Sequence, residues 1–307
     1  MSSSSSLLLL LFLLSLSGVK PTSGFKICAF NVQSFGDSKS HNTEVMRTII
    51  RIVSRCDVCL LQEVRDSKQK AIPVFLFSLR HNSQNQYDYV ASERLGRTPS
   101  YQEQYVFVFR IGSVTVTDQY QYLDMLRGDE DAFSREPFIV RLHTRKTAIR
   151  DFVLVPQHTT PTNATKEIDA LYDVFLDVKK KWKTEMVMFL GDFNADCGYV
   201  AKKNWQHVRL YSNQAFVWLI GDAEDTTVRE TTTCAYDRIV VHGEAFAKAI
   251  VPQSAQPFNF PKEYGLTEEQ ALDVSDHYPV EVELKAGSEH LGGHTLLIVL
   301  MAFFIST

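Results

Sequence analysis

Two carboxylates and an amide, Asp192, Asn194 and Asp196, follow an apolar run at residues 186–190. A short apolar run that stops at a glycine predicts a buried strand ending at a sheet edge, where α/β proteins place their chemistry. Oxygen donors at this spacing suit a hard cation such as Mg²⁺ or Ca²⁺, a phosphate oxygen or a water. Asp and Asn also favour turns, so this stretch alone leaves a purely structural turn equally open.

Polar side chains recur where other predicted strands end. A lone histidine is more often structural than catalytic, but independent loops do not usually gather carboxylates, amides and imidazoles in this way. One shared cleft would explain the pattern, and imidazoles beside carboxylates could transfer protons there. The residues concerned are Asn31, Glu63, His158, Asp192, Asn194, Asp237, Asp276 and His277.

Hydrophobic periodicity indicates the elements that must position these residues. Many strands, few helices and no β–α alternation favour an α+β sandwich of two sheets flanked by helices, in one domain at residues 25–284. Residues 105–110 and 114–120 alternate like neighbouring antiparallel strands. Strands are predicted at 25–32, 58–64, 87–92, 105–110, 114–120, 137–142, 151–156, 186–190, 237–241 and 273–284, and helices at 45–54, 71–79 and 167–182.

The charge balance gives no general attraction to nucleic acid, because the chain of 307 residues carries a formal net charge of -4. A polyanionic partner would require local arginines and bound cations to overcome this repulsion.

Both ends of the chain carry targeting signals. An apolar run at residues 7–16, followed by small and polar residues at 18–24, predicts a signal peptide at 1–24 that is cleaved in the secretory pathway. Residues 285–307 combine small residues, a polar spacer and an apolar stretch at 295–305, the pattern of a glycolipid-anchor signal. A hydrophobic tail held in the bilayer and a merely sticky extension remain open. We therefore expect a secreted or cell-surface protein that passes through the endoplasmic reticulum.

Five cysteines in a secretory chain predict few disulfides and at least one free thiol. Cys197 and Cys234 lie beside polar motifs and are the predicted pair. Cys28 lies in an apolar strand pattern and is expected in the core. Cys56 and Cys59 form a C-x-x-C with no second pair to complete a zinc site, so packing is expected for Cys59. Asn163 heads the only N-glycosylation sequon.

Several strings resemble the deoxyribonuclease I family, in register across residues 25–284. They are A-F-N, L-L-Q-E-V-R-D, Y-V-F-V-F-R, S-R-E-P, L-Y-D-V-F-L-D-V, G-D-F-N-A-D-C, C-A-Y-D-R-I-V-V and S-D-H-Y-P-V-E-V. The resemblance implies a four-layered α/β sandwich of two mainly antiparallel sheets flanked by helices. It also implies Mg²⁺- and Ca²⁺-dependent cleavage of double-stranded DNA that leaves 5′-phosphate ends. The C-terminal tail favours a secreted or membrane-associated member of the family.

The resemblance also implies roles for individual residues. The catalytic histidines are His158, paired with Glu103, and His277, paired with Asp237. Metal and phosphate binding is implied for Asn31, Glu63, Asp192, Asn194 and Asp276. Minor-groove contact is implied for Arg65 and Tyr101, and phosphate contact for Arg135. One structural Ca²⁺ is implied at Asp124, Asp131 and Phe133, a second at Asp225 and Thr227, and a disulfide between Cys197 and Cys234.

Departures from the family pattern limit what it implies. Gln33 stands where an arginine would contact phosphate, which predicts weaker DNA binding. Residues 125–131 contain no cysteine, so the family's second disulfide is absent and a looser loop is expected there. Ala91 and Phe138 change the predicted actin-binding surface around residues 89–91, so we expect weak or no actin binding. We also expect the protein to be a monomer.

Two other functions remain open, because this fold alone does not choose a substrate. A phospholipid phosphodiesterase is the enzymatic alternative, and a catalytically inactive DNA- or actin-binding relative is the non-enzymatic one. Assays on plasmid DNA and on sphingomyelin would separate these functions.

Overall fold

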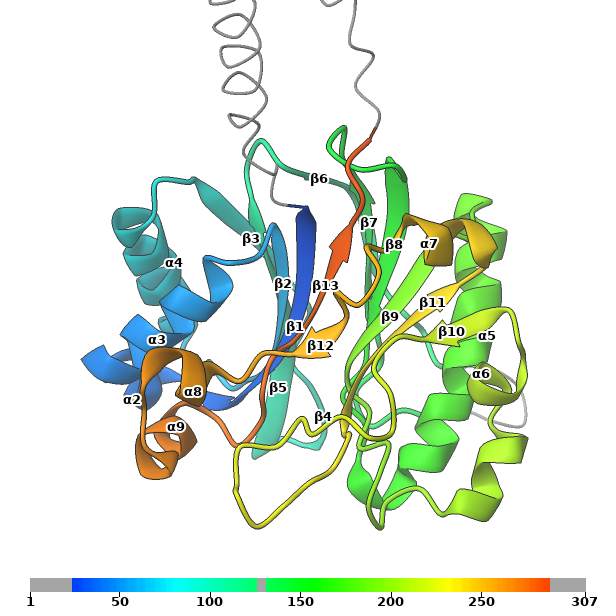
Figure 1. Cartoon of the computed structure of the whole chain (residues 1–307). Helices are drawn as coiled ribbons and strands as arrows, with labels where there is room; N and C mark the ends of the chain where they lie inside the picture. The colour runs from blue at the N-terminus through cyan, green and yellow to red at the C-terminus, as the bar shows by residue number, and fades with distance from the viewer. Residues whose placement is uncertain (1–23, 126–130, 288–307) are drawn as a thin grey trace, which may run out of the picture.

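The computed structural model describes residues 24–125 and 131–287, so residues 1–23 of the predicted signal peptide and all of the tail beyond Gly287 lie outside the described residues. Two sheets pack face to face, with helices on both outer faces (Figure 1). This four-layered arrangement confirms the predicted fold class. Within the described ranges, no helix is both long enough and apolar enough to cross a membrane.

The first sheet has seven strands and the second has six. In spatial order the first contains β12 (Gln256–Pro257), β13 (Val280–Leu284), β1 (Phe25–Phe35), β2 (Val58–Val64), β5 (Tyr101–Arg110) and β3 (Tyr87–Ala91), with β4 (Leu95–Thr98) paired to β5. The second contains β10 (Phe216–Trp218), β11 (Asp237–His242), β9 (Val187–Asp192), β8 (Asp151–Pro156), β7 (Phe138–His143) and β6 (Thr115–Gln121).

Helices cover the outer face of each sheet (Figure 1). The first sheet is covered by α2 (Asp37–Ser40), α3 (Thr43–Val53), α4 (Ala71–Asn82), α8 (Phe260–Tyr264) and α9 (Glu268–Val274). The second is covered by α5 (Ala164–Trp182) and α6 (Arg209–Ser212), and α7 (Glu244–Ala249) follows β11. Short 3₁₀ helices span η1 (Pro161–Asn163) and η2 (Lys202–His207).

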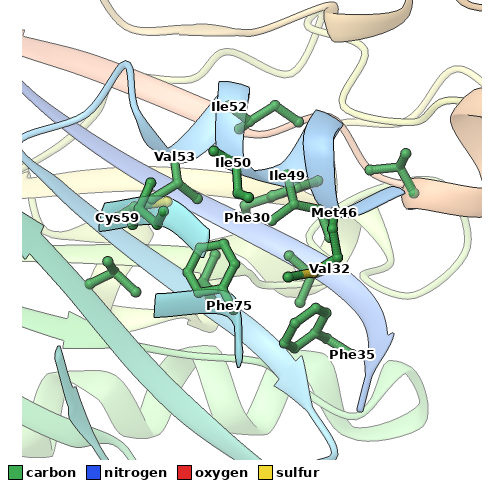
Figure 2. Close-up of a cluster of buried hydrophobic side chains, with 14 of the residues drawn as sticks. Phe30, Val32, Phe35, Met46, Ile49, Ile50, Ile52, Val53, Cys59 and Phe75 are labelled. Atoms are coloured by element: carbon green, nitrogen blue, oxygen red, sulfur yellow. The ribbon is translucent and has the colours of Figure 1, made fainter. Parts of the chain in front are cut away.

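Strand β1 shows how the sequence builds this layering. Its side chains alternate, so Phe30 and Val32 pack against α3, whereas Ile27 and Ala29 pack against the second sheet. Figure 2 shows Phe30 and Val32 beside Ile49 of α3. Because both faces of the strand are buried, its sequence is nearly continuously apolar.

The predicted absence of β–α alternation is wrong. Strands β1 and β2 are parallel and joined through α3, and β8 and β9 are parallel and joined through α5. A parallel pair needs such a crossover, and the helix provides it. All other strand pairs are antiparallel, as expected.

The predicted pairing of residues 105–110 with 114–120 is also wrong. Strand β5 pairs with β2, β3 and β4 in the first sheet, whereas β6 pairs with β7 in the second. The short connection between them crosses from one sheet to the other. Alternation along each strand correctly identified two strands, but it contains no information about which neighbour each strand binds.

The cysteine pairing confirms one expectation and corrects another. Cys197 and Cys234 form the predicted disulfide, and Cys59 is buried as a free thiol. Cys28 is buried as expected, but it also forms a disulfide with Cys56. This bond ties β1 to the turn that follows α3, a pairing that depends on the crossover and is not visible in local sequence.

These pairings predict one free thiol per chain. When protein produced in an oxidising compartment is denatured without reductant, thiol titration should detect only Cys59, because the other four cysteines are paired. After reduction, all five should react. Three thiols before reduction would contradict the Cys28–Cys56 bond.

The two sheets meet most closely beside the end of β9. The buried Gln62 side chain on β2 donates to the Gln157 carbonyl (2.7 Å) and accepts from the Asp192 N–H (2.9 Å), so one amide joins both sheets. Gly191 lies at this junction with φ +128, and a Cβ there would lie 2.5 Å from the Gln157 carbonyl oxygen. Only glycine fits this conformation and this contact.

Gly191→Ala should therefore destabilise the protein by about 2–4 kcal/mol, through backbone strain and the clash with Gln157. Thermal unfolding in chelator-containing buffer measures this change. Gly198→Ala is the matched control, because a Cβ at Gly198 meets nothing within 4 Å. Equal melting temperatures for the two variants would contradict the tight junction.

Candidate active site

The predicted polar residues gather at one end of the sandwich. In the second sheet Asp192 ends β9 and pairs with Asp237, which begins the antiparallel β11. Asn31 and Glu63 lie near the ends of the parallel strands β1 and β2 of the first sheet. A cavity of about 570 Å³ opens between them, and Glu63, Tyr101, Arg135, His158, Asp192, Asn194, Asp276 and His277 contribute to its lining. A larger cavity of about 710 Å³ beside α3 contains none of the predicted site residues.

Five side chains form a row beneath this cavity, and the three central ones, His158, Asp192 and His277, contribute to its lining. His158 Nδ1 lies 2.6 Å from Glu103 Oε1, and His277 Nδ1 lies 2.7 Å from Asp237 Oδ2. The opposite ring nitrogens of both histidines approach the same oxygen, Asp192 Oδ2, at 3.5 and 3.6 Å. The two imidazoles therefore face each other across one carboxylate, and each is oriented by a second carboxylate behind it.

Mutual attraction favours the charged forms of Glu103, His158 and His277 despite their burial. Burial disfavours ionised Glu103, but His158 and Arg135 outweigh that effect and lower the pKa of the carboxyl group. Burial also opposes protonation of His277, but Asp237 and Asp192 raise the pKa of its imidazole well above the usual value. Glu103 raises the pKa of His158 against burial in the same way.

The two acids of the second sheet differ in how far their charge is compensated. Burial favours the neutral form of Asp192, yet His277 and His158 outweigh burial and lower its pKa. Burial raises the pKa of the deeper Asp237, and although His277 and Thr226 oppose this effect, the charge of Asp192 adds to it. The carboxylate shared by the two rings is thus the more firmly ionised of the two.

Arg135 lies against Glu103 and not on an open rim. Its Nε is 3.0 Å from Glu103 Oε1 and donates to the His158 carbonyl, and Nη2 donates to the Thr159 carbonyl. The side chain is buried but contributes to the cavity lining. Its established contacts therefore brace the Glu103–His158 pair, and phosphate contact by Arg135 stays a prediction.

The oxygen and amide donors sit on strained backbone. Glu63 has φ 57 and Asn194 has φ 47, conformations that non-glycine residues adopt rarely. The pairing of β2 with β5 shifts register between Leu61 and Val64, next to Glu63. Such bulges redirect a side chain at the end of a strand, and residual strain of this kind concentrates at functional sites.

The donor set near Glu63 fits a hard divalent cation. Its carboxylate is partly exposed to the cavity and accepts from the Asn31 amide (3.1 Å) and the Ser34 N–H (2.9 Å). Asn31 also donates to Asp192 Oδ2 at 3.2 Å. Carboxylate oxygens are ligands that Mg²⁺ and Ca²⁺ prefer. The Asn31 amide turns its NH₂ toward the two carboxylates, because its Oδ1 accepts from the Gln33 N–H at 3.0 Å. Ligand atoms of Asp192, Asp237 and His277 also converge within 4.8 Å, but Asp237 is fully buried behind the ring it orients.

The exposed rim carries the predicted minor-groove residues. The Arg65 guanidinium stacks over the Tyr101 ring at 4.3 Å, and Arg65 also donates weakly to the Ser34 hydroxyl (3.4 Å). Both side chains are accessible, so a flat, charged and aromatic pair stands beside the cavity. Asp276, partly exposed, completes the rim next to His277.

The structure gives the predicted calcium positions internal partners. The Arg97 guanidinium contacts the Asp131 carboxylate and the carbonyls of Asp131 and Phe133, and Asp124 accepts from the Phe133 N–H. The predicted looser loop at 125–131 falls mostly outside the described residues. At the second position Asp225 accepts from the N–H and hydroxyl of Thr227. Calcium at both positions stays a prediction.

Sequence reasoning missed two side chains that position the site. Gln62 joins the sheets directly beneath Asp192, and a polar residue inside an apolar strand was its signal. Lys39 donates to the carbonyls of Val32, Gln33 and Val274, which holds the end of β1 against α9. Burial lowers the pKa of Lys39 to about 8. Nothing in the local sequence distinguishes this lysine from a surface one.

Comparison with known proteins first gives the class. Residues 28–277 match the Endonuclease/Exonuclease/phosphatase family. Among solved structures, a family protein from Leptotrichia buccalis aligns with a TM-score of 0.61 at 14% identity, covering 85% of this chain and 99% of that chain. At this identity the likeness shows the fold alone.

Relatives with much higher identity narrow the assignment. Deoxyribonuclease gamma of Mus musculus is 51% identical over 280 residues, covering 91% of this chain and 89% of that protein. Deoxyribonuclease-1 of Canis lupus familiaris is 50% identical over 261 residues, covering 85% of this chain and 91% of that protein. The chain therefore belongs to the Endonuclease/Exonuclease/phosphatase family and, within it, to the deoxyribonuclease I group.

In the metal-free protein, His277 should remain protonated at a pH well above 6.5, because Asp237 and Asp192 stabilise its charge. NMR titration of the ring in chelator should show this. The raised pKa contributes stability that is fully present below the unfolded pKa and is lost as pH rises through the folded pKa. Asp237→Asn should lower the His277 pKa and weaken this loss of stability with pH. A wild-type pKa near 6.5 would refute the charge arrangement.

Proposed function

We propose that this protein is a divalent-metal-dependent endonuclease that hydrolyses double-stranded DNA with little sequence preference and leaves 5′-phosphate ends. The observation that carries this proposal is the convergence of two carboxylate-oriented imidazoles on Asp192 within one open cavity. The named deoxyribonuclease relatives support DNA as the substrate.

Hydrolysis of a phosphodiester requires one group that accepts a proton and one that donates a proton, on opposite sides of the phosphorus. Water attacks phosphorus and gives its proton to one imidazole, and the bond from phosphorus to the 3′ oxygen breaks as the other imidazolium donates a proton to that oxygen. Glu103 and Asp237 keep Nδ1 of each ring engaged, so both Nε2 atoms remain directed at the cavity. The products are a 5′-phosphate and a 3′-hydroxyl, and the proton count balances.

Charge on the phosphoryl oxygens must also be stabilised. The carboxylates of Glu63 and Asp192, which the Asn31 amide links, would hold a divalent cation, which supplies Lewis-acid stabilisation when bound. Asn194 lines the same cavity and donates its own amide to the Thr159 carbonyl, which fixes its orientation. We propose Mg²⁺ at this position and Ca²⁺ at the two structural positions.

Recognition of a duplex fits the shape of the rim. A double helix is too wide for the cavity, so binding should insert Arg65 and Tyr101 into the minor groove while phosphates approach the cavity. Contacts of this kind read groove width more than base identity, which gives the weak sequence preference. Gln33 adds no positive charge here, so the affinity for DNA should be modest.

We further infer that the protein enters the secretory pathway and acts as a monomer outside the cell or on its surface, held there by the C-terminal tail. The Asn163 amide donates to the Ala132 carbonyl at 3.3 Å, and a glycan on its nitrogen would leave one N–H as a donor. Phe138 is buried between the sheets and contributes nothing to an actin surface. The expectation of weak actin binding therefore rests on Ala91 alone.

His158→Ala and His277→Ala should each lower plasmid nicking by about 10²–10⁴-fold, because each removes one proton-transfer group. Chelation of divalent cations should abolish nicking in the wild type. His143→Ala is the matched control, since this histidine contacts Asp151 away from the cavity and should leave the rate unchanged.

Unchanged nicking in both cavity variants would contradict the assignment of the histidines. The same preparations should be tested on sphingomyelin vesicles. Metal-dependent hydrolysis of sphingomyelin without DNA cleavage would favour the phospholipid phosphodiesterase. Binding of DNA without hydrolysis of either substrate would favour the inactive relative.

A further inference from the structure

The end of the molecule opposite the active site carries a cluster of unpaired cations. Six exposed side chains, which we call the basic pole, lie on three connections at this end. Within the described ranges none of the six has a carboxylate at ion-pair distance. They are Arg145, Lys146 and Arg150 between β7 and β8, Lys180 and Lys183 at the end of α5, and Lys285 after β13.

Hydrogen bonds hold the three connections together. The Thr144 N–H donates to the Arg150 carbonyl (2.8 Å), which closes the β7–β8 connection. The Val153 N–H donates to the Met186 carbonyl (2.8 Å), so the start of β8 lies beside the segment that follows α5. The Ala148 N–H donates to the Lys285 carbonyl at 3.0 Å. The cations therefore share one ordered surface.

Three glutamates near this surface already pair with other lysines. Glu185 pairs with Lys179, Glu244 with Lys248 (2.7 Å) and Glu283 with Lys26 (3.4 Å). Asp151 contacts His143 at 3.1 Å, and Asp177, which lines a cavity with Lys180, accepts from the Tyr120 hydroxyl (2.6 Å), so these two carboxylates offset part of the positive charge. The six cations of the basic pole outnumber them, so an excess of positive charge is available to an anionic partner.

The last described residue also contacts this surface. Gly287, the last described residue, donates from its N–H to the Lys146 carbonyl (2.9 Å), and the end of β13 lies at the same end of the molecule as the start of β1 (Figure 1). An almost wholly apolar run begins at residue 295. The intervening residues, 288–294, span at most about 25 Å when extended. An apolar segment inserted in a bilayer would therefore hold the basic pole close to the lipid headgroups.

From these observations we propose that the basic pole binds an anionic phospholipid surface. Lys and Arg near such a surface each contribute about 1 kcal/mol, roughly a factor of five in binding. The active site faces the other way, because β9 runs from this end, at Val187, to Asp192 at the cavity. A protein bound through the basic pole would keep its cavity open to DNA in solution.

The test compares partition of the full chain onto phosphatidylcholine vesicles with and without about one-third phosphatidylserine. The wild type should prefer the anionic vesicles, and raising the salt concentration should weaken that preference. The combined variant Arg145→Gln, Arg150→Gln, Lys180→Gln should lose on the order of 100-fold of the preference. The ratio of the partition coefficients for the two kinds of vesicle cancels the contribution of the apolar tail, because both kinds bind the tail.

The matched control is Lys202→Gln, Lys203→Gln, Lys262→Gln, which removes three exposed lysines from η2 and α8. It should keep the wild-type preference within about two-fold, because charges beyond a Debye length of the surface are screened. Both combined variants should nick plasmid DNA at the wild-type rate, which shows that they are folded. Vesicle partition is measured without DNA, so its outcome does not depend on the catalytic proposal.

Equal binding of the wild type to both vesicles would overturn the proposal, and so would an unchanged preference in the basic-pole variant. Duplex DNA provides the remaining comparison, in an uncleaving His277→Ala background. A basic-pole variant that keeps its vesicle preference but loses duplex affinity would identify a nucleic-acid surface instead, and would also overturn the proposal.

Discussion

The carboxylate of Asp192 is buried between two imidazoles, and this burial constrains the rest of the site. An isolated buried carboxylate would cost several kcal/mol, so its neighbours must supply compensating charge and hydrogen bonds. His158 and His277 supply the charge, and the Asn31 amide and the Asn194 N–H supply hydrogen bonds. Since these partners come from both sheets, the energy of one carboxylate depends on how the whole sandwich is assembled.

This dependence explains why the junction between the sheets is so specific. A one-residue slip of β11 against β9 would turn Asp237 away from its ring, because side chains alternate between faces. Gln62 holds the junction at the level of Asp192, and the close approach requires a residue without Cβ at Gly191. Left-handed backbone at Glu63 is tolerated beside it because the surrounding strands leave little alternative.

The sequence predicted elements and strand ends better than it predicted connections. The apolar run before Asp192 identified β9 and its end, and the α5 pattern began only a few residues late. The Cys28–Cys56 disulfide and the separation of β5 from β6 depend on chain crossovers, which periodicity does not encode. Glu103 points inward from β5 like any alternating residue, so only the family resemblance could identify it as a partner of His158.

The net charge of -4 is a sum that hides two ends of the molecule with exposed charges of opposite sign. The loop before β11 and helix α9 lie at the other end of the molecule from the basic pole and carry exposed acids, including Glu224, Glu230, Glu269 and Asp273 (Figure 1). A polyanion approaching the cavity meets this acidic surface, so the few rim arginines and bound divalent cations must supply the local attraction. If the site binds DNA with bound divalent cations as proposed, charge segregation makes those cations contribute to binding as well as to chemistry, which net charge alone does not reveal.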